Sequence, residues 1–360
     1  MSVEDANRKV ILGLSGGVDS TAAALILKER GYDVTGLYFN IHSNDKSGEK
    51  KAAKVASELD IDLIIKDVSK QFEDIVVKNF INEYANGRTP NPCILCNPEI
   101  KFRTLIQEAD RLGAGCIATG HYANTVFSSK QKCNVVKMSA NRKKDQSYML
   151  YRLSPDVLRR LILPLSDYED KEHIREIART RSMSNAEDKD SQEICFLKEG
   201  EEYITFLKEH GVDACEGDFI DKDGKYLGKH SGIINYTIGQ RKGLGITLGK
   251  PAFVTDINPI NNTVELGDNN DLFTDEVICD NVFFTASSGS EIPDYIKDVK
   301  LYGKIRYAAK PSECRVEKYK ENMIKVIFDE PQRAATGGQS LVLYLNDEVC
   351  GGGFIKIERN

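Results

Sequence analysis

Hydrophobic and polar residues alternate in two different ways along this chain. In the first third, short apolar runs are separated by longer segments with helical spacing, and after about residue 276 apolar and polar residues alternate with a period of two. The first pattern predicts a parallel sheet with helices on both faces, and the second predicts short antiparallel strands. The sequence therefore predicts an α/β part followed by an all-β part.

The individual elements follow from the same patterns. Strands are predicted at 9–14, 33–40, 61–68 and 115–120, and helices at about 21–30, 50–59, 70–86, 98–112 and 155–190. Between Gly217 and Gly232, Asp-Gly turn signals separate short apolar runs. We expect three domains: an α/β domain at 1–198, a small central domain at 199–275 and a C-terminal antiparallel β-barrel at 276–360.

The segment SGGVDS follows the first predicted strand and precedes a helix. In a parallel sheet, such a loop lies at the edge where ligands bind. Its glycines let the backbone approach a ligand, and the positive end of the helix favours an anion. A phosphate-bound Mg²⁺ would explain Asp19. The loop lacks the lysine of GxxxxGK[ST] and differs from GxGxxG, and a plain glycine turn that caps the helix is the alternative.

Composition and charge narrow the class of protein. The chain has 360 residues, of which 41% are hydrophobic and 29% are charged, as in ordinary globular proteins. No apolar run approaches the length of a membrane helix, and the polar N-terminus resembles neither a signal nor a transit peptide, so we expect a cytoplasmic protein. A net charge of −6 argues against a surface that coats nucleic acid, although a local basic patch could still bind RNA.

The nine cysteines are odd in number and irregularly spaced, which favours free thiols in a reducing compartment. The pair Cys93 and Cys96 lies in the proline-rich segment TPNPCILCN. This pair could be a metal clip, a redox couple or part of a catalytic site. Apart from Cys195, the other cysteines lie in apolar or strand-like contexts and are expected to be small buried hydrophobic residues: Cys116, Cys133, Cys215, Cys279, Cys314 and Cys350.

Several motifs together carry a family resemblance. SGGVDS resembles the pyrophosphate loop (PP-loop) of adenine-nucleotide hydrolases, which split ATP into AMP and pyrophosphate. Further motifs, from Gly13 to the final GGGFI, occur in the order found in the tRNA-specific 2-thiouridylases, and the chain resembles that family over nearly its whole length. These motifs are GRTPNPCILCN, ATGHYA, KKDQSYMLYRL, SQEICF and YTIGQRKGLGI. The resemblance implies ATP-dependent replacement of the position-2 oxygen of the wobble uridine by persulfide sulfur.

The resemblance also implies roles for two cysteines. Cys195 is the implied persulfide carrier, and Cys96 the nucleophile that frees its sulfur, so that the two form a transient disulfide. Sulfur transfer needs exposed thiols of low pKa, and we expect Cys96 in a loop just before a helix N-terminus. The implied ATP site comprises Gly13, Leu14, Ser15, Gly16, Gly17, Val18, Asp19, Ser20, Phe39 and Gly120.

Cys93 departs from the family, because many members have Asp at this position. Cys93, Cys96 and Cys195 could therefore form a three-thiolate site, which suits an iron–sulfur cluster better than four-ligand structural zinc. A metal-free persulfide relay is the main alternative. Structural zinc and an incidental Cys93 also stay open.

The implied tRNA contacts are spread along the chain. The target base must leave the anticodon stack before its position 2 can be reached, so a pocket beside Cys96 is expected. The implied contacts are Asn91, Pro92, Cys93, His121, Lys144, Asp145, Gln146, Arg306, Tyr307 and Gln339. A capping histidine, core packing of Phe39 and a solvated charged loop at 144–146 are the structural alternatives. The expected basic face is drawn from Lys101, Arg103, Lys143, Lys144, Arg241, Lys242 and Arg306.

The predicted partners are tRNA and a sulfur donor such as a cysteine desulfurase, and we expect a monomer that uses ATP and Mg²⁺. The sequence leaves two alternative functions open. An amide-forming synthetase with the same ATP loop would need neither Cys96 nor Cys195. A non-catalytic RNA-binding protein with a degenerate ATP site would release no pyrophosphate.

Overall fold

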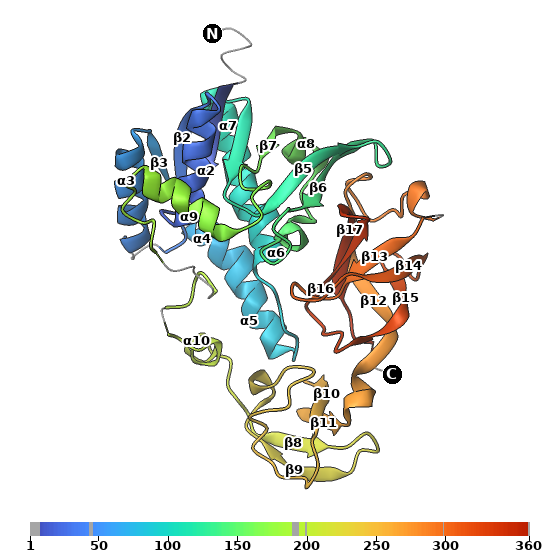
Figure 1. Cartoon of the computed structure of the whole chain (residues 1–360). Coiled ribbons are helices and arrows are strands. Elements are labelled where there is room, and N and C mark those ends of the chain that lie inside the picture. Colours follow the sequence, from blue (N-terminus) through green and yellow to red (C-terminus); the bar gives the residue numbers. More distant parts are fainter. Residues whose placement is uncertain (1–7, 43–45, 189–193, 199, 298, 359–360) are drawn as a thin grey trace. The chain divides into compact units, whose positions relative to one another are not determined.

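The chain folds into two compact units. The computed structural model describes residues 8–42, 46–188, 194–198, 200–297 and 299–358 (Figure 1). The first unit takes residues 1–76, 93–192 and 347–350, and the second takes 77–92, 193–346 and 351–360. The helix that precedes the Cys-x-x-C motif therefore belongs to the second unit, whereas both cysteines of the motif belong to the first.

A parallel sheet forms the centre of the first unit. Its five strands are, in spatial order, β3 (Leu63–Asp67), β2 (Asp33–Asn40), β1 (Lys9–Gly13), β4 (Cys116–Thr119) and β7 (Leu161–Ile162), and every pairing is parallel. Val10 and Leu12 on one face of the central strand and Ile11 on the other face are all buried, as expected for a strand that is covered on both faces. The predicted parallel sheet is confirmed. β7 was not predicted, because its two residues are too few to show a pattern.

Helices cover this sheet. One core contains Val10 and Leu12 together with residues of α2 (Val18–Glu29), α3 (Ser47–Leu59) and α9 (Lys171–Thr180). α7 (Arg103–Leu112) also contacts β1 and β4, but none of its residues belongs to that core. The sheet therefore carries helices on both faces, as the sequence predicted.

Two predicted helices are interrupted by wider π-helical turns. The segment predicted at 70–86 consists of α4 (Ser69–Phe72), a π-helical stretch (Glu73–Val77) and α5 (Lys78–Ala85). The segment predicted at 98–112 starts earlier, with α6 (Cys93–Cys96) and a π-helical stretch (Asn97–Phe102) before α7. The expectation of a loop at Cys96 is therefore wrong, because the helix already begins at Cys93.

The first unit also contains a β-hairpin and further helical segments. β5 (Ala123–Ser128) and β6 (Cys133–Met138) form an antiparallel hairpin, and a 3-10 turn follows at Ser147–Leu150. The helical pattern at 155–190 is realised as two helices, α8 (Pro155–Arg160) and α9, with β7 between them. Residues 189 and 190 of that prediction lie outside the described residues.

The second unit contains a small sheet in its central part. Its strand order is β10 (Phe253–Asn258), β11 (Thr263–Gly267), β8 (Gly217–Ile220) and β9 (Tyr226–His230), and α10 (Tyr203–Glu209) precedes it in the chain. β8 and β9 pair antiparallel across the predicted Asp-Gly turn, where Gly224 has a φ of +79°. Phe219, Val254 and Val264 form the fully buried centre of this sheet.

The C-terminal part of the second unit is a closed barrel. Its strand order is β12 (Phe273–Phe284), β15 (Ile324–Arg333), β14 (Ser312–Lys318), β13 (Leu301–Lys304), β16 (Ser340–Leu345) and β17 (Glu348–Ile355). β12 pairs with both β15 and β17, which closes the ring and removes the free edges. The predicted barrel is confirmed. Arg306 and Tyr307 lie in the turn after β13, which ends at Lys304.

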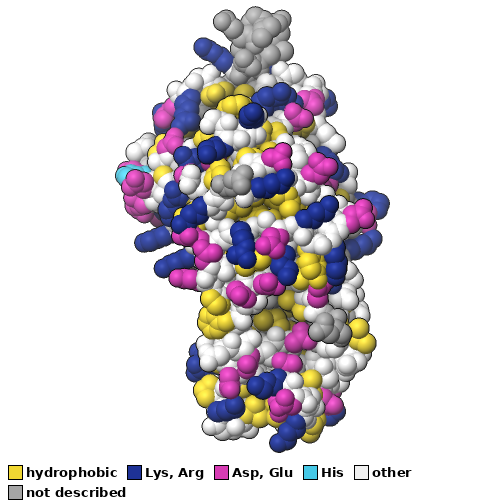
Figure 2. All heavy atoms as spheres, turned by 90° about the vertical axis from the view of Figure 1, so that its right-hand side faces the viewer, with side chains coloured by type: hydrophobic (Ala, Val, Ile, Leu, Met, Phe, Trp, Pro, Cys, Tyr) yellow, Lys and Arg dark blue, Asp and Glu magenta, His cyan; other side chains and the backbone are white. Residues whose placement is uncertain are grey.

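Charges of both signs cover the surface. Figure 2 shows lysines and arginines interspersed with acidic side chains over one face. Ion pairs such as Arg103–Glu99 and Lys325–Glu276 are part of this mixture. No helix among the described residues is long and apolar enough to cross a membrane.

The packing of α9 on the sheet yields a test of stability. Ile174 is fully buried in the core that α9 shares with α2. We expect Ile174→Ala to lower the free energy of unfolding by about 2–5 kcal/mol, because it leaves a cavity in that core. Urea unfolding followed by circular dichroism measures this loss. Ile177→Ala, at a half-buried position on the same helix, is the control, and an equal loss in both variants would contradict this account of the core.

Candidate active site

The SGGVDS loop is held in shape by its own hydroxyl groups. The Ser20 Oγ donates to the Gly17 carbonyl at 2.9 Å and accepts from the Ser15 N–H at 3.3 Å. The two serine Oγ atoms lie 3.2 Å apart, and the Gly17 N–H donates to the Ser15 Oγ at 3.3 Å. These hydrogen bonds hold the loop in one shape.

Glycine is required where this loop meets other backbone segments. Gly16 has a φ of +82°, and a Cβ there would lie 2.9 Å from the Ala52 nitrogen of α3. A Cβ on Gly120 would lie 2.9 Å from the Asp19 carbonyl carbon. The two glycines therefore allow α3 and the end of β4 to pack directly against the loop.

The predicted ATP positions meet at one edge of the sheet. A Cβ on Gly13, at the end of β1, would lie 3.4 Å from the Phe39 ring of β2, so these two residues are neighbours. Leu14 is buried and donates its N–H to the Leu37 carbonyl at 2.8 Å, and Val18 is buried in the core. Leu14 and Val18 therefore pack inward and can face a ligand only through their backbone.

The start of α2 presents backbone donors. Gly17 is the N-cap residue and supplies no side-chain cap to the described helix, which runs for 12 residues from Val18. The N–H groups of the first turn have no acceptor within a helix. Together with the helix dipole, they make this end suited to a phosphate group.

Asp19 lies in this first turn, and its carboxylate is occupied. Tyr122 donates its hydroxyl to one carboxylate oxygen at 2.7 Å, and the Lys171 Nζ lies 3.2 Å from the other. Both carboxylate oxygens thus have protein partners in this arrangement, and the role of Asp19 as a ligand of a phosphate-bound Mg²⁺ stays a prediction. We therefore derive no step through a metal bound to Asp19.

Asn185 is a loop contact that the sequence analysis missed. Its Nδ2 donates to the Gly16 carbonyl and to the Thr21 Oγ1, both at 2.7 Å, and the side chain is 5% exposed. Its Oδ1 is buried and accepts no hydrogen bond within the described residues. Asn185 follows α9 in the chain and carries no motif, so only its spatial position reveals the contact.

The Cys-x-x-C motif lies at the start of a helix. Cys93 begins α6 and is half-buried, and Cys96 is buried, with 5% of its surface exposed. The Asn97 side chain, next in the chain, donates to the Met149 carbonyl at 3.0 Å. The expectation that Cys96 is exposed is wrong, because a residue inside the helical segment packs into the unit.

Cys195 lies in the second unit and is exposed. The adjacent Phe196 is 6% exposed, and its ring lies 5.1 Å from that of Phe80 and 5.2 Å from that of Phe206. Cys195 is thus attached to an aromatic cluster that includes α5. The preceding residues of the SQEICF motif, 191–193, lie outside the described residues.

The structure leaves the predicted cysteine site untested. Cys93 and Cys96 belong to one unit and Cys195 to the other. Within the described residues, no three His, Cys, Asp or Glu side chains form a metal-binding group.

Two predicted tRNA contacts serve the local fold. Asp145 is buried, and its carboxylate accepts from the Ser139 N–H at 2.9 Å and from the Ser147 hydroxyl at 2.7 Å. The Gln146 Oε1 accepts from the Tyr122 N–H at 2.9 Å. The half-buried Lys144 joins the same turn through its backbone N–H, which donates to the Asn141 side chain at 3.1 Å. Asp145 and Gln146 thus hold the turn beside Tyr122.

In the second unit, Gln339 ties the barrel to the segment before the Cys-x-x-C motif. Its Nε2 donates to the Thr89 carbonyl at 2.6 Å, and the Thr89 N–H donates to the Gly337 carbonyl at 2.9 Å. Asn91 and Pro92, which follow Thr89 in the chain, are half-buried. The Gln339 side chain therefore positions the residues that lead into the motif.

The other predicted contacts of the barrel are close together. The Arg306 Nη1 donates to the Arg333 carbonyl at 2.9 Å. The Tyr307 ring lies 5.9 Å from the Nζ of Lys304, which is 7% exposed. Both predicted residues are half-buried, and each leaves part of its side chain at the surface.

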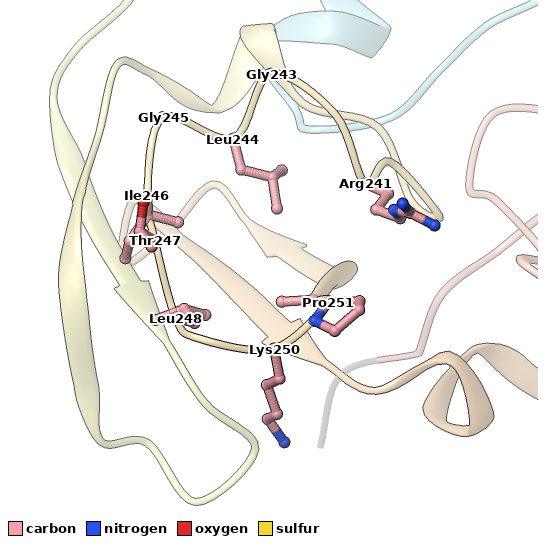
Figure 3. Close-up of a pocket in the computed structure, with 10 residues that line it drawn as sticks. Arg241, Gly243, Leu244, Gly245, Ile246, Thr247, Leu248, Lys250 and Pro251 are labelled. Carbon is pink, nitrogen blue, oxygen red and sulfur yellow. The ribbon is translucent and has the colours of Figure 1, made fainter.

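A cavity of about 390 Å³ lies in the glycine-rich basic segment of the second unit (Figure 3). Residues 236–252, all of them described, contain no strand, so the segment is an irregular loop. Figure 3 shows Leu244 pointing into this loop and Lys250 pointing away from it. Lys250 is paired with Asp268 at 3.0 Å, and Arg241 also lines the cavity.

His121 is held neutral beside the end of β4. Its Nδ1 lies 2.8 Å from the Thr119 Oγ1, and its ring stacks on Phe102 at 6.0 Å. Burial, together with the smaller effect of the nearby Lys101 charge, lowers the pKa of His121 to about 3.

This shift predicts a pH-dependent stability. The pKa of His121 is about 3 in the folded chain and about 6.5 when unfolded, so the neutral imidazole contributes stability that is full above pH 6.5 and is lost as the pH falls towards 3. Urea unfolding at several pH values should show this loss, with a slope of up to about 1.4 kcal/mol per pH unit from this group. His121→Gln should flatten the slope. Parallel pH profiles for the two proteins would contradict the assignment.

Comparisons with known proteins match nearly the whole chain. Family models match residues 8–199 (tRNA methyl transferase HUP domain), 204–268 (tRNA methyl transferase PRC-barrel domain) and 281–355 (aminomethyltransferase beta-barrel domain). Two solved structures are similar over about half of the chain at 15% identity: the NMN synthetase of Francisella tularensis (TM-score 0.33, 52% of this chain and 68% of that one) and the NH3-dependent NAD synthetase of Campylobacter jejuni (TM-score 0.30, 49% and 66%).

Curated relatives are similar over nearly their full length. The tRNA-specific 2-thiouridylase MnmA of Clostridioides difficile is 45% identical over 362 residues, covering 97% of this chain and 98% of that protein. The relative of the same name from Syntrophomonas wolfei is 44% identical over 347 residues, covering 96% and 99%. The predicted family resemblance is confirmed: this chain belongs to the tRNA-specific 2-thiouridylase family.

Proposed function

We propose that this chain is a tRNA-uridine 2-sulfurtransferase that forms 2-thiouridine with ATP. The observation that carries the proposal is the preorganised SGGVDS loop at the uncapped N-terminus of α2, in a chain that also supplies Cys96 and Cys195. Helix N–H groups bind the phosphates of ATP, and the Phe39 ring beside Gly13 lies where an adenine could pack.

The reaction has two stages. The position-2 oxygen of the uridine attacks the α-phosphorus of ATP, and pyrophosphate leaves. The terminal sulfur of a Cys195 persulfide then attacks position 2, the bond to oxygen breaks and AMP leaves. Cys96 attacks the inner sulfur of Cys195, which frees the thiolated base and leaves a Cys96–Cys195 disulfide for an external thiol to reduce.

The cysteine site has two proposed forms. In the metal-free form, Cys93 replaces the aspartate that many relatives have. In the other form, Cys93, Cys96 and Cys195 would hold an iron–sulfur cluster, which would serve as the source of sulfide. Both forms require the two units to bring Cys195 to the Cys-x-x-C motif during the reaction.

The remaining predicted features complete the proposal. The tRNA lies on the exposed parts of Asn91, Pro92, Cys93, His121 and Lys144, and on Arg306 and Tyr307 of the barrel. Three further residues support tRNA binding indirectly, because their hydrogen bonds position the contact segments: Asp145, Gln146 and Gln339. Mg²⁺ binds together with the phosphates of ATP. The sulfur donor is a cysteine desulfurase or a relay protein. The enzyme is a monomer and acts in the cytoplasm. The proposed domain boundaries are 198/199 and 275/276.

Methyl transfer is the second candidate, because two of the matching family models carry that description. The curated relatives are instead named 2-thiouridylases. A loop built for phosphates and a pair of cysteines have no evident task in methyl transfer, which favours thiolation. The modified nucleoside itself decides between the two reactions, because a sulfur and a methyl group change its mass differently.

Single serine substitutions at Cys96 and Cys195 test the reaction. Each should lower 2-thiouridine formation by at least about 100-fold, because each removes a reacting sulfur. Nucleoside mass spectrometry after incubation of unmodified tRNA with ATP and a persulfide donor measures the product. Cys215 belongs to the same unit as Cys195 and is exposed, so the expectation that it is buried is wrong. Cys215→Ser is the control and should keep full activity. Full 2-thiouridine formation by Cys96→Ser would contradict the role of Cys96 as the nucleophile. No 2-thiouridine from the unaltered chain would instead support the amide-forming rival.

Anaerobic purification separates the two forms of the site. Stoichiometric iron and acid-labile sulfide, lost in serine variants of Cys93, Cys96 and Cys195, would establish the cluster. Active protein without iron would establish the metal-free relay.

A further inference from the structure

The nucleotide loop contains no basic residue of its own. Its one charged side chain is Asp19, which carries the same sign as a phosphate group. In the described structure, a cation reaches this loop from a distant part of the sequence, the first turn of α9.

That cation is Lys171. Its Nζ lies 3.2 Å from the Asp19 Oδ2, and its side chain is only 15% exposed, whereas that of Asp19 is 33% exposed. The other carboxylate oxygen accepts from the Tyr122 hydroxyl at 2.7 Å. Asp19 therefore has one partner from the end of the sheet and one from α9, and it keeps the first if the second leaves.

α9 is fixed firmly enough to place a lysine there. The Asp170 side chain caps the helix by accepting the His173 N–H at 3.0 Å. Ile174 is fully buried in the core shared with α2. Arg175 donates to the Ala186 and Asp188 carbonyls, each at 2.9 Å.

The segment that Arg175 holds contains Asn185, which in turn bonds the Gly16 carbonyl and the Thr21 hydroxyl at 2.7 Å. α9 thus reaches the loop at two independent points, through Lys171 directly and through Asn185. The lysine lies at a supported site beside the phosphate donors and not on a mobile surface.

We propose that Lys171 is the phosphate-binding cation of this loop, and that it exchanges Asp19 for phosphate oxygens when ATP binds. The proposal rests on the proposed use of ATP and names a residue for the same site. Lysine suits the exchange because its ammonium is a compact charge on a flexible stem. A triphosphate carries more negative charge than one carboxylate, so it competes for the ammonium group, while Tyr122 holds Asp19 in place.

The competing explanation is that Lys171 only neutralises Asp19. A double substitution separates the two roles. If neutralisation is the whole role, Lys171→Met weakens ATP binding through the uncompensated Asp19 charge, and adding Asp19→Asn restores it. If Lys171 binds phosphate, the double variant stays weak, because the cation is still missing.

The experiment is calorimetric titration of the full chain, without tRNA, with the α,β-methylene analogue of ATP and separately with inorganic pyrophosphate. Lys171→Met should weaken binding of both ligands by roughly 10- to 100-fold, the value of one charge-assisted hydrogen bond. Lys171→Arg should recover part of the loss. Lys54→Met, which removes an exposed lysine paired with Glu58 on α3, is the matched control and should bind as the unaltered chain does.

The outcomes distinguish this inference from the proposed function. Unaltered affinity in Lys171→Met, or full recovery in the double variant, would overturn the role of Lys171 and leave the function standing. No binding of either ligand by the unaltered chain would instead count against the ATP-dependent function. Thermal unfolding of each variant shows whether a loss of binding reflects a loss of fold, and a folded Lys171→Arg with partial affinity keeps the test decisive.

Discussion

The candidate site depends on how the first turn of α2 is held. Four elements converge on it: β1 feeds directly into the loop, α3 and the end of β4 pack against it through Gly16 and Gly120, and α9 reaches it through Lys171 and Asn185. Because buried backbone cannot shift without losing these contacts, they hold the N–H groups of the turn in place. Preorganisation of this kind reduces the ordering cost of binding a phosphate.

Hydrogen bonds around Tyr122 also support the nucleotide loop. Asp145 and Gln146 shape the turn beside it, and Tyr122 in turn holds Asp19. A motif that the family resemblance assigns to tRNA is therefore connected by hydrogen bonds to the nucleotide loop. A tRNA bound on Lys144 would touch the turn that supports the carboxylate of Asp19, which links the two substrates within one unit.

Contacts within the second unit hold the segment that leads to Cys93 and the segment that contains Cys195. Its barrel holds Thr89 through Gln339, and its aromatic cluster holds Cys195 through Phe196 and Phe80. Residues before Cys93 thus belong with the barrel, and residues from Cys93 onward belong with the parallel sheet. The Cys-x-x-C motif lies where the chain passes from one unit to the other, which suits the proposed transfer of sulfur from Cys195.

Periodicity and short motifs in the sequence were enough to predict the parallel sheet, the SGGVDS loop, the closed barrel and the family. These features depend on local patterns: apolar runs for buried strands, alternation for a barrel, and glycines at a strand-to-helix turn. The burial of Cys96 was not predictable in this way, because the helix starts at Cys93 despite two nearby prolines. Lys171 and Asn185 carry no local signal at all. They are separated from the loop by more than 150 residues, and only the packing of α9 on α2 brings them to Asp19 and Gly16.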